Sequence, residues 1–174
     1  MIKKILLTAI LLLIIAGGAF FFMNSTDNYD ASKYSATVTT MAEGESIDFT
    51  LPDQFDTSHT LGDDTKTLVL TFSKETSHIA RDFLLKQPAD YLSSRSAYYI
   101  ADISPMPTVI RNAFAMPDLK KSSYPVLLMY DGAIAAKFRD EAQLNSIMIV
   151  SLENKKITSI KFADDADTLK ALLK

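Results

Sequence analysis

The first 23 residues carry an apolar segment preceded by two lysines. After Lys3 and Lys4 come 19 uncharged, mostly apolar residues from Ile5 to Met23. As a helix rising 1.5 Å per residue this segment covers about 28 Å, close to the hydrocarbon thickness of a bilayer. The lysines predict a cytoplasmic N-terminus, with all later residues on the far side. Small residues follow the apolar stretch Ile5 to Ile15, so residues 1–23 are predicted to be a signal anchor or a cleaved signal peptide.

Residues 24–46 have a different character. They are rich in Ser, Thr, Asp, Asn and Ala, with isolated Tyr29 and Tyr34, and they show neither a helical nor a strand period. Segments of this kind bury too little apolar surface to fold on their own. We therefore predict a flexible polar tether between the apolar segment and a domain that covers residues 47–174.

From Ile47 onward the pattern alternates between strand and helix periods. Ile47, Phe49 and Leu51 alternate with polar residues, and with His59–Leu61 they predict an N-terminal hairpin. Continuous apolar runs predict buried strands, and apolar residues three to four apart predict helices. The remaining predicted order is strand 67–72, a helix carrying Ile79 to Leu84, strand 97–103, a helix starting at Ser104 and Pro105 and closed before Pro117, strand 125–129, short helix 133–138, strands 147–152 and 157–162, and a final helix capped by Asp164.

This order resembles the redoxin and peroxiredoxin branch of the thioredoxin superfamily over residues 47–174. Phe49-Thr50-Leu51-Pro52-Asp53 looks like its first strand, and Tyr124-Pro125-Val126-Leu127 with Asp131-Gly132 looks like its mid-domain segment. The resemblance implies an α/β fold, a thioredoxin-like three-layer sandwich with a mixed central sheet. The parallel pairing of strands 67–72 and 97–103 also follows from the intervening helix.

Shorter motifs resemble a family of uncharacterised small exported bacterial proteins that are often labelled FAD/FMN-containing dehydrogenases. These motifs are Asp53-Gln54-Phe55, Pro88-Ala89-Asp90-Tyr91-Leu92, Ala101-Asp102-Ile103-Ser104 and Tyr124-Pro125-Val126-Leu127-Leu128. The label implies a flavin, but Gly44, Gly62 and Gly132 stand too far apart for the G-x-G-x-x-G turn that admits a pyrophosphate. No cofactor is predicted.

The chain has no cysteine, which removes the usual chemistry of a thioredoxin-like fold. The C-x-x-C motif would fall at Ser77-His78-Ile79-Ala80, where no side chain can supply the thiolate that disulfide exchange requires. Ser77, His78 and free backbone N–H groups at a helix start could instead hold an anion or a peptide carboxylate. An X-Pro bond before a strand can be cis and line the substrate groove in this superfamily. We therefore name Ser77, His78, Tyr124 and Pro125 as a candidate ligand or partner groove.

Other functions find less support. Beyond Lys3 and Lys4 there are 16 basic and 21 acidic residues, a balance that argues against nucleic acid. The two histidines, His59 and His78, lack a G-x-S-x-G partner for hydrolysis and lack a short metal-binding spacing. No catalytic or metal-binding residue is predicted, and the acidic clusters lack the D-x-D-x-D-G loop of a calcium site.

The sequence favours a redox-inactive domain over an enzyme. We expect a single-pass inner-membrane protein, attached through residues 5–23, whose periplasmic domain binds or helps to assemble another envelope protein. If the signal is cleaved, the domain would be periplasmic. The alternatives are an oxidoreductase component, in which a flavin or a partner's thiols do the chemistry, and a purely structural envelope protein.

Overall fold

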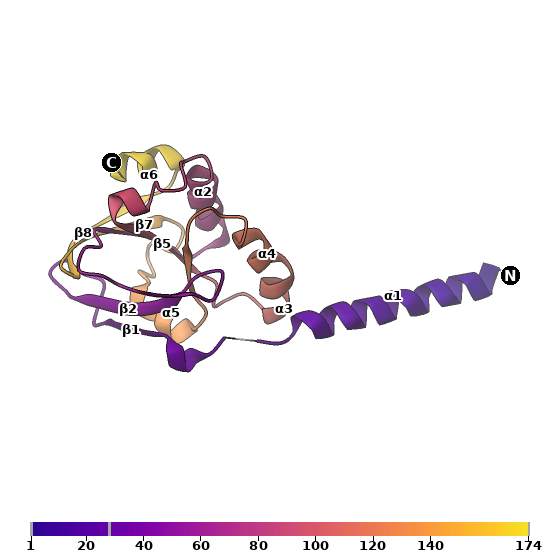
Figure 1. The fold of residues 1–174 in the computed structure, drawn as a ribbon. Coiled ribbons are helices and arrows are strands. Elements are labelled where there is room, and N and C mark those ends of the chain that lie inside the picture. The colour runs from indigo at the N-terminus through magenta and orange to yellow at the C-terminus, as the bar shows by residue number, and fades with distance from the viewer. Residues whose placement is uncertain (1, 28, 174) are drawn as a thin grey trace.

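The computed structural model describes residues 2–27 and 29–173. A single long helix, α1 (Ile2–Asn24), extends away from the folded domain (Figure 1). From Lys3 to Asn24 it is long and apolar enough to cross a membrane, and its most apolar window is not covered by any other part of the described chain. Both predicted uses of the segment, as an anchor and as a signal, are compatible with this helix.

The domain is built around a five-stranded mixed sheet in the order β6-β5-β4-β7-β8. Its strands are β4 (Thr67–Thr71), β5 (Ala97–Asp102), β6 (Val126–Met129), β7 (Ile147–Glu153) and β8 (Lys156–Ala163). Strands β4, β5 and β6 are parallel, whereas β7 runs antiparallel to β4 and β8 antiparallel to β7. The predicted fold class, a mixed α/β sandwich of thioredoxin-like topology, is confirmed by this order and these directions.

Helices cover one face of the sheet. They are α2 (Lys74–Leu84), α6 (Ala166–Leu172) and a continuous helical segment made of α3 (Thr108–Ile110), the π-turn η3 (Arg111–Ala115) and α4 (Met116–Leu119). Ala80, Phe83 and Leu84 of α2 are buried against this face, as the 3.6-residue period predicts. A 3₁₀ turn, η2 (Ser93–Arg95), precedes β5. Helix α6 is capped by Asp165, so the prediction of Asp164 as the cap was wrong, and Asp164 instead accepts a hydrogen bond from Ser146.

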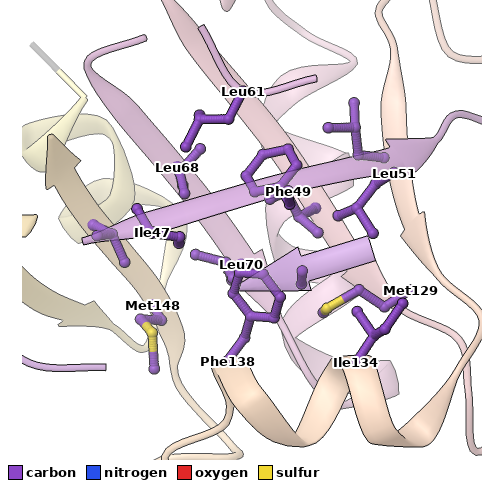
Figure 2. Packing of buried hydrophobic residues seen from close by; sticks show 14 of the residues in the cluster. Ile47, Phe49, Leu51, Leu61, Leu68, Leu70, Met129, Ile134, Phe138 and Met148 are labelled. Carbon is purple, nitrogen blue, oxygen red and sulfur yellow. The ribbon is translucent and has the colours of Figure 1, made fainter. Parts of the chain in front are cut away.

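A small antiparallel sheet and helix α5 (Gly132–Phe138) cover the other face. The small sheet contains β1 (Ser35–Val38), β2 (Ile47–Pro52) and β3 (Ser58–Thr60) in that spatial order, which confirms the predicted hairpin. Figure 2 shows how side chains from all three sources interlock: Ile47, Phe49 and Leu51 from β2, Leu68 and Leu70 from β4, and Ile134 and Phe138 from α5. The three predicted layers are therefore present.

Strand β1 lies inside the segment that the sequence predicts to be a tether. It pairs antiparallel with β2, its residue Ala36 is buried, and the Lys137 side chain donates a hydrogen bond to the Ala36 carbonyl oxygen at 2.6 Å. A 3₁₀ turn, η1 (Ala31–Lys33), precedes it. The prediction of an unstructured segment was wrong here. A strand with so few buried residues shows no readable alternation, and the pairing with β2 supplies the hydrogen bonds that stabilise it.

The helix predicted with Ser104 as its N-cap and Pro105 as its first residue begins three residues later, with Pro107 as the N-cap and Thr108 as the first residue. Ser104 instead donates its backbone N–H and its hydroxyl to the Asp102 carboxylate, which holds it in a turn. The helix also continues through Pro117 rather than ending before it. The Met116 N–H donates to the Arg111 carbonyl, the wider π spacing, immediately before the proline that has no N–H to contribute.

Candidate functional site

A cavity of about 460 Å³ opens between α2 and the α3–η3–α4 segment, and we call it the α2–α4 groove. Its floor is β5 and the residue after it, through Tyr99, Ala101 and Ile103, which lie on one face because side chains alternate along a strand. The small side chain of Ala101 leaves room above the sheet. The walls are lined by Lys74, Ser77, His78 and Arg81 on α2, and by Met106, Ile110, Phe114, Ala115, Asp118 and Leu119.

The groove lies at the edge of the sheet where the parallel strands end. Strand β4 leads directly into α2, and β5 leads through a turn into α3. In open α/β sheets ligands bind at this carboxyl edge, beside the point where the strand connections diverge. Strand β4 pairs with parallel β5 on one side and antiparallel β7 on the other. The groove thus occupies the position where this architecture usually places a functional site.

Three hydroxyl groups form a connected chain beside the floor of the groove. Ser77 Oγ donates to Thr71 Oγ1 at 2.9 Å, and Thr71 Oγ1 lies 3.2 Å from the Tyr99 hydroxyl. Tyr99 is fully buried, and burial raises the pKa of its phenol, so the ring stays neutral. The network uses the Ser77 hydroxyl internally, and nothing in it provides a base that would activate a nucleophile.

An ion pair joins the two walls. Arg81 Nη1 lies 2.6 Å from Asp118 Oδ2, and Arg81 Nη2 donates to the Asp118 carbonyl oxygen at 3.4 Å. The hydrogen bond from Arg81 lowers the pKa of Asp118 against the opposing effect of burial, so the carboxyl is ionised at neutral pH. Arg81 Nε is buried and has no hydrogen-bond partner among the described residues. The pair fixes the spacing between α2 and α4 at one side of the groove.

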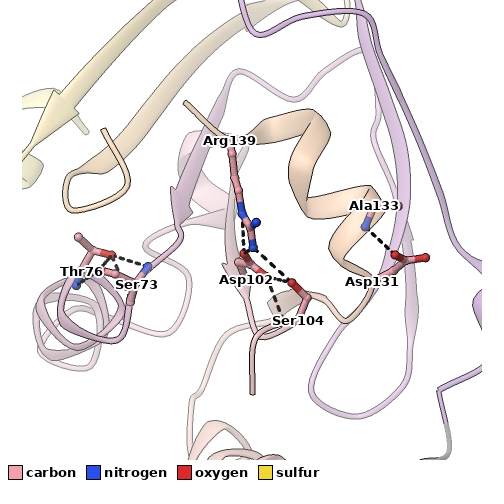
Figure 3. A network of polar contacts seen from close by, with 7 residues as sticks. All are labelled: Ser73, Thr76, Asp102, Ser104, Asp131, Ala133 and Arg139. Carbon is pink, nitrogen blue, oxygen red and sulfur yellow. Dashed lines mark hydrogen bonds and ion pairs between the residues drawn. The ribbon is translucent and has the colours of Figure 1, made fainter. Parts of the chain in front are cut away.

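Ser77 and His78, two of the four predicted groove residues, do line this cavity. The free N–H groups predicted beside them are absent from this stretch of the described chain, because α2 begins one turn earlier, at Lys74. The Ser77 N–H donates to the Ser73 carbonyl at 3.1 Å. Ser73 is the N-cap and forms a reciprocal capping box with Thr76 (Figure 3). The hypothesis that Ser77 and His78 form an anion site at the helix start was therefore wrong.

Tyr124 and Pro125, the other two, lie elsewhere. They border a second cavity of about 210 Å³ with Ala89, Ala97 and Tyr98, beside the first residues of β5 and β6 and therefore at the opposite edge of the sheet. The Tyr124–Pro125 peptide bond is trans. The buried side chain of Gln54 donates to the Tyr124 carbonyl at 2.9 Å and accepts from the Val126 N–H at 2.8 Å. This segment is a braced strand entry that borders the second cavity, although the Tyr124 ring packs edge to face against Tyr99 of the groove floor, with ring centroids 6.5 Å apart.

The apolar wall of the groove is the part that sequence reasoning missed. The helical period places Ile110 and Phe114 on the apolar side of the helix predicted before Pro117, yet their exposed fractions are 47% and 61%. Their spacing of four residues was a visible signal, since it places both on one side of a helix. What could not be read was that this side faces outward, because the helix starts later than predicted and widens at the π-turn.

Two further polar clusters stabilise the fold. Arg139 pairs with the buried Asp102 carboxylate, through Nε at 3.1 Å and through Nη2, and so ties the end of β5 to the residue after α5 (Figure 3). Asp53 accepts hydrogen bonds from the Phe55 and Thr57 N–H groups and lies 3.0 Å from His59 Nε2. No three His, Asp or Glu side chains within residues 2–27 and 29–173 gather closely enough to hold a metal ion.

Comparison with known proteins gives structural neighbours only. No protein-family model matches the chain, and no curated protein matches it. Among solved structures, the chain is similar to a candidate protein disulfide isomerase from Bacteroides thetaiotaomicron, at 20% identity and a TM-score of 0.48 over 81% of this chain and 88% of that one. It is also similar to the thioredoxin domain of a thiol-disulfide oxidoreductase from Bacteroides vulgatus, at 14% identity and a TM-score of 0.46 over 78% and 100%.

A peroxiredoxin-like protein from Aquifex aeolicus is a third neighbour, at 10% identity and a TM-score of 0.48 over 80% of this chain and 92% of that one. Such identities concern the fold alone. The strand order and directions described above give this chain the thioredoxin-like fold, while its lack of cysteine separates it chemically from proteins that exchange disulfides.

Proposed function

We propose that this protein is a membrane-tethered, redox-inactive domain of thioredoxin-like fold that binds another envelope protein through the α2–α4 groove. The observation that carries the proposal is the groove itself. A cavity of about 460 Å³ stands at the functional edge of the sheet in a chain without a sulfur nucleophile. A groove of this size with a mostly apolar lining is suited to recognition.

The lining of the groove indicates the chemistry of a partner. Its floor and one wall are mostly apolar, whereas α2 presents the exposed side chains of Lys74 and His78. Arg81 and Asp118 satisfy each other's charge. A partner segment that inserts an apolar side chain, with a carboxylate beside it to meet Lys74, would complement this surface. An extended apolar helix leading into the domain supports tethering to the inner membrane, with the domain in the periplasm.

Site-specific crosslinking in intact cells tests the binding role. A photoreactive amino acid at position 78 in the full chain should capture a partner of defined mass. Ala115→Trp would fill the groove from its wall and should abolish the capture, whereas Ala89→Trp, which adds the same bulk at the second cavity, should leave it intact. Capture that survives Ala115→Trp would show that the groove is not the binding site. No capture at all would favour a purely structural envelope protein.

The competing hypothesis is an oxidoreductase that uses a flavin or a partner's thiols. The purified full chain should show no absorbance at the flavin maximum of about 450 nm. It should also not accelerate the reduction of insulin disulfides. A stoichiometric yellow cofactor would overturn the redox-inactive proposal. So would insulin reduction that depends on this protein in the presence of a thiol donor.

A further inference from the structure

The C-terminal end of α1 is attached to the domain at one particular helix. Asn112 Nδ2 donates to the carbonyl oxygens of Asn24 and Thr26, at 3.0 and 2.8 Å. The last carbonyls of a helix have no partner within the helix, so a side chain from elsewhere that satisfies one of them is a specific attachment. Figure 1 shows α3 beside the point where α1 ends.

Residues beyond α1 reinforce this attachment. Asp27 Oδ1 lies 2.8 Å from Nη2 of Arg111, whose side chain is buried and lies over the Tyr130 ring at 4.8 Å. Tyr29 stacks on both Tyr130 and Tyr34, with ring centroids 4.7 and 5.5 Å apart. The predicted flexible tether is therefore corrected once more: its first residues contact the domain and fix where the apolar helix enters it.

The attachment brings Phe114 to the depth of the apolar segment. The Phe114 and Phe20 ring centroids are 6.2 Å apart. Phe20 precedes Met23, the last apolar residue of the segment, by three positions, which is about 4.5 Å along a helix axis. If α1 spans a bilayer, a side chain level with Phe20 lies within the membrane interface. Ile110, one helical turn before Phe114, is exposed in the same way.

We propose that Ile110 and Phe114 form a membrane-docking ridge that inserts into the interfacial layer of the bilayer spanned by α1. The inference rests on the proposed anchoring and not on the groove's binding role. Large apolar side chains that stay exposed beside an apolar helix are stabilised by burial at the boundary between headgroups and acyl chains. The occupant of this apolar surface is therefore a lipid surface, and the α2–α4 groove, which shares Ile110 and Phe114, would open next to it.

The sequence offers a clean reporter, because the full chain contains no tryptophan. Phe114→Trp in the full chain introduces a single tryptophan at the ridge, which can be excited selectively over the tyrosines. Leu85→Trp is the matched control, since Leu85 is also apolar, has an exposed fraction of 48%, and follows the C-terminal end of α2. Helix α2 returns from the end of β4 toward the start of β5, so position 85 lies at the sheet edge opposite α1.

Both variants would be reconstituted in vesicles of phosphatidylcholine and phosphatidylglycerol, with and without lipids brominated near the top of the acyl chains. The F114W fluorescence should be blue-shifted and quenched several-fold more strongly than the L85W fluorescence. Adding Asn112→Ala to F114W should reduce the quenching, because the attachment of α1 is weakened. Ile110→Trp provides a second reporter if F114W disturbs folding.

Each remaining outcome decides a different point. Equal quenching of F114W and L85W in protein that stays in the vesicles would overturn the docking ridge while leaving the anchor in place. A blue shift that grows with the protein-to-lipid ratio, without bromine quenching, would replace the lipid surface with a second copy of the chain. If every variant is washed from the vesicles by alkaline carbonate, the anchoring itself fails.

Discussion

The two faces of the central sheet are built differently. On one face a second sheet and α5 pack against the five strands. There the rings of Phe49 and Phe138 pack edge to face, with their centroids 6.2 Å apart. On the other face α2 and α4 stand apart over Ala101, and the Arg81–Asp118 pair bridges them beside an open groove. Both faces carry a buried core, but only the second also has room for a ligand beside that core.

We call the face covered by the small sheet and α5 the closed face, and the face with the α2–α4 groove the open face. The largest effect on stability is expected on the closed face. Phe49→Ala should destabilise the protein by about 3–5 kcal/mol, because it removes a fully buried ring and leaves a cavity. Phe114→Ala, at an exposed position of the open face, should change stability by less than about 0.5 kcal/mol. Urea unfolding of the full chain in detergent micelles measures both. Similar midpoints for the two variants would contradict the division between the faces.

The closed face also depends on the segment before Ile47. A chain that begins at Ser46 lacks β1 and loses the burial of Tyr34 and Ala36, whereas one that begins at Ser25 keeps them. We expect the shorter chain to be less stable by roughly 2–4 kcal/mol, the value of burying one aromatic side chain and pairing one edge strand. Equal urea midpoints for the two soluble proteins would mean that β1 adds nothing to the fold.

Acid should weaken the edge of the small sheet through Asp53. Burial alone would raise the pKa of this carboxyl, but hydrogen bonds from His59 and from the Thr57 and Phe55 N–H groups outweigh it and lower the pKa below the usual value of 3.8. The stabilisation is therefore complete above that value and is lost as the pH falls through the folded-state pKa.

The Asp53→Asn variant provides the comparison. At neutral pH it should be less stable than the unmodified chain by about 1.5–3 kcal/mol, the value of hydrogen bonds to a charged group. Between pH 5 and 3, taken as roughly the range in which a carboxyl titrates, its stability should fall less steeply. Urea midpoints measured across this range test the slope, and parallel curves would exclude Asp53 as a contributor.

A small effect is expected from the ion pair across the groove. Asp118→Asn should cost no more than about 1 kcal/mol, because the Asp118 side chain is 47% exposed and water screens the pair. The same variant should lower crosslinking from position 78 if the spacing of α2 and α4 matters for recognition. A loss of stability as large as that of Phe49→Ala would contradict a pair that water screens.

The strands of the domain were predictable because their chemistry is local. The apolar run from Leu68 to Leu70 and the alternation of Ile47, Phe49 and Leu51 predict buried strands from neighbouring residues alone. Strand β1 was not predictable, since it depends on partners elsewhere in the chain, and the start of the helix at Thr108 was not predictable, since local side-chain hydrogen bonds and not the hydrophobic period set it. Strand β1 is stabilised by its pairing with β2 and by the hydrogen bond from Lys137. Ser104 is held in a turn before the helix by its hydrogen bond to the Asp102 carboxylate.

The candidate site shows the same limit. Ser77 and His78 were found by counting from the end of β4, and both line the groove. Tyr124 and Pro125 were placed by resemblance alone, and they border a different cavity at the other edge of the sheet. The wall formed by Ile110 and Phe114 depends on the direction in which a helical face points, which a hydrophobic period does not specify.

The Asn112 and Asp27 contacts have a consequence for how the protein would meet other molecules. If α1 anchors the protein in a membrane as proposed, a domain attached at the end of that helix cannot move far from the bilayer, so its reach is set by its own radius. Its encounters would then be confined to a thin layer above the bilayer and governed by lateral diffusion. Partners that share the same membrane would meet it far more often than freely diffusing ones.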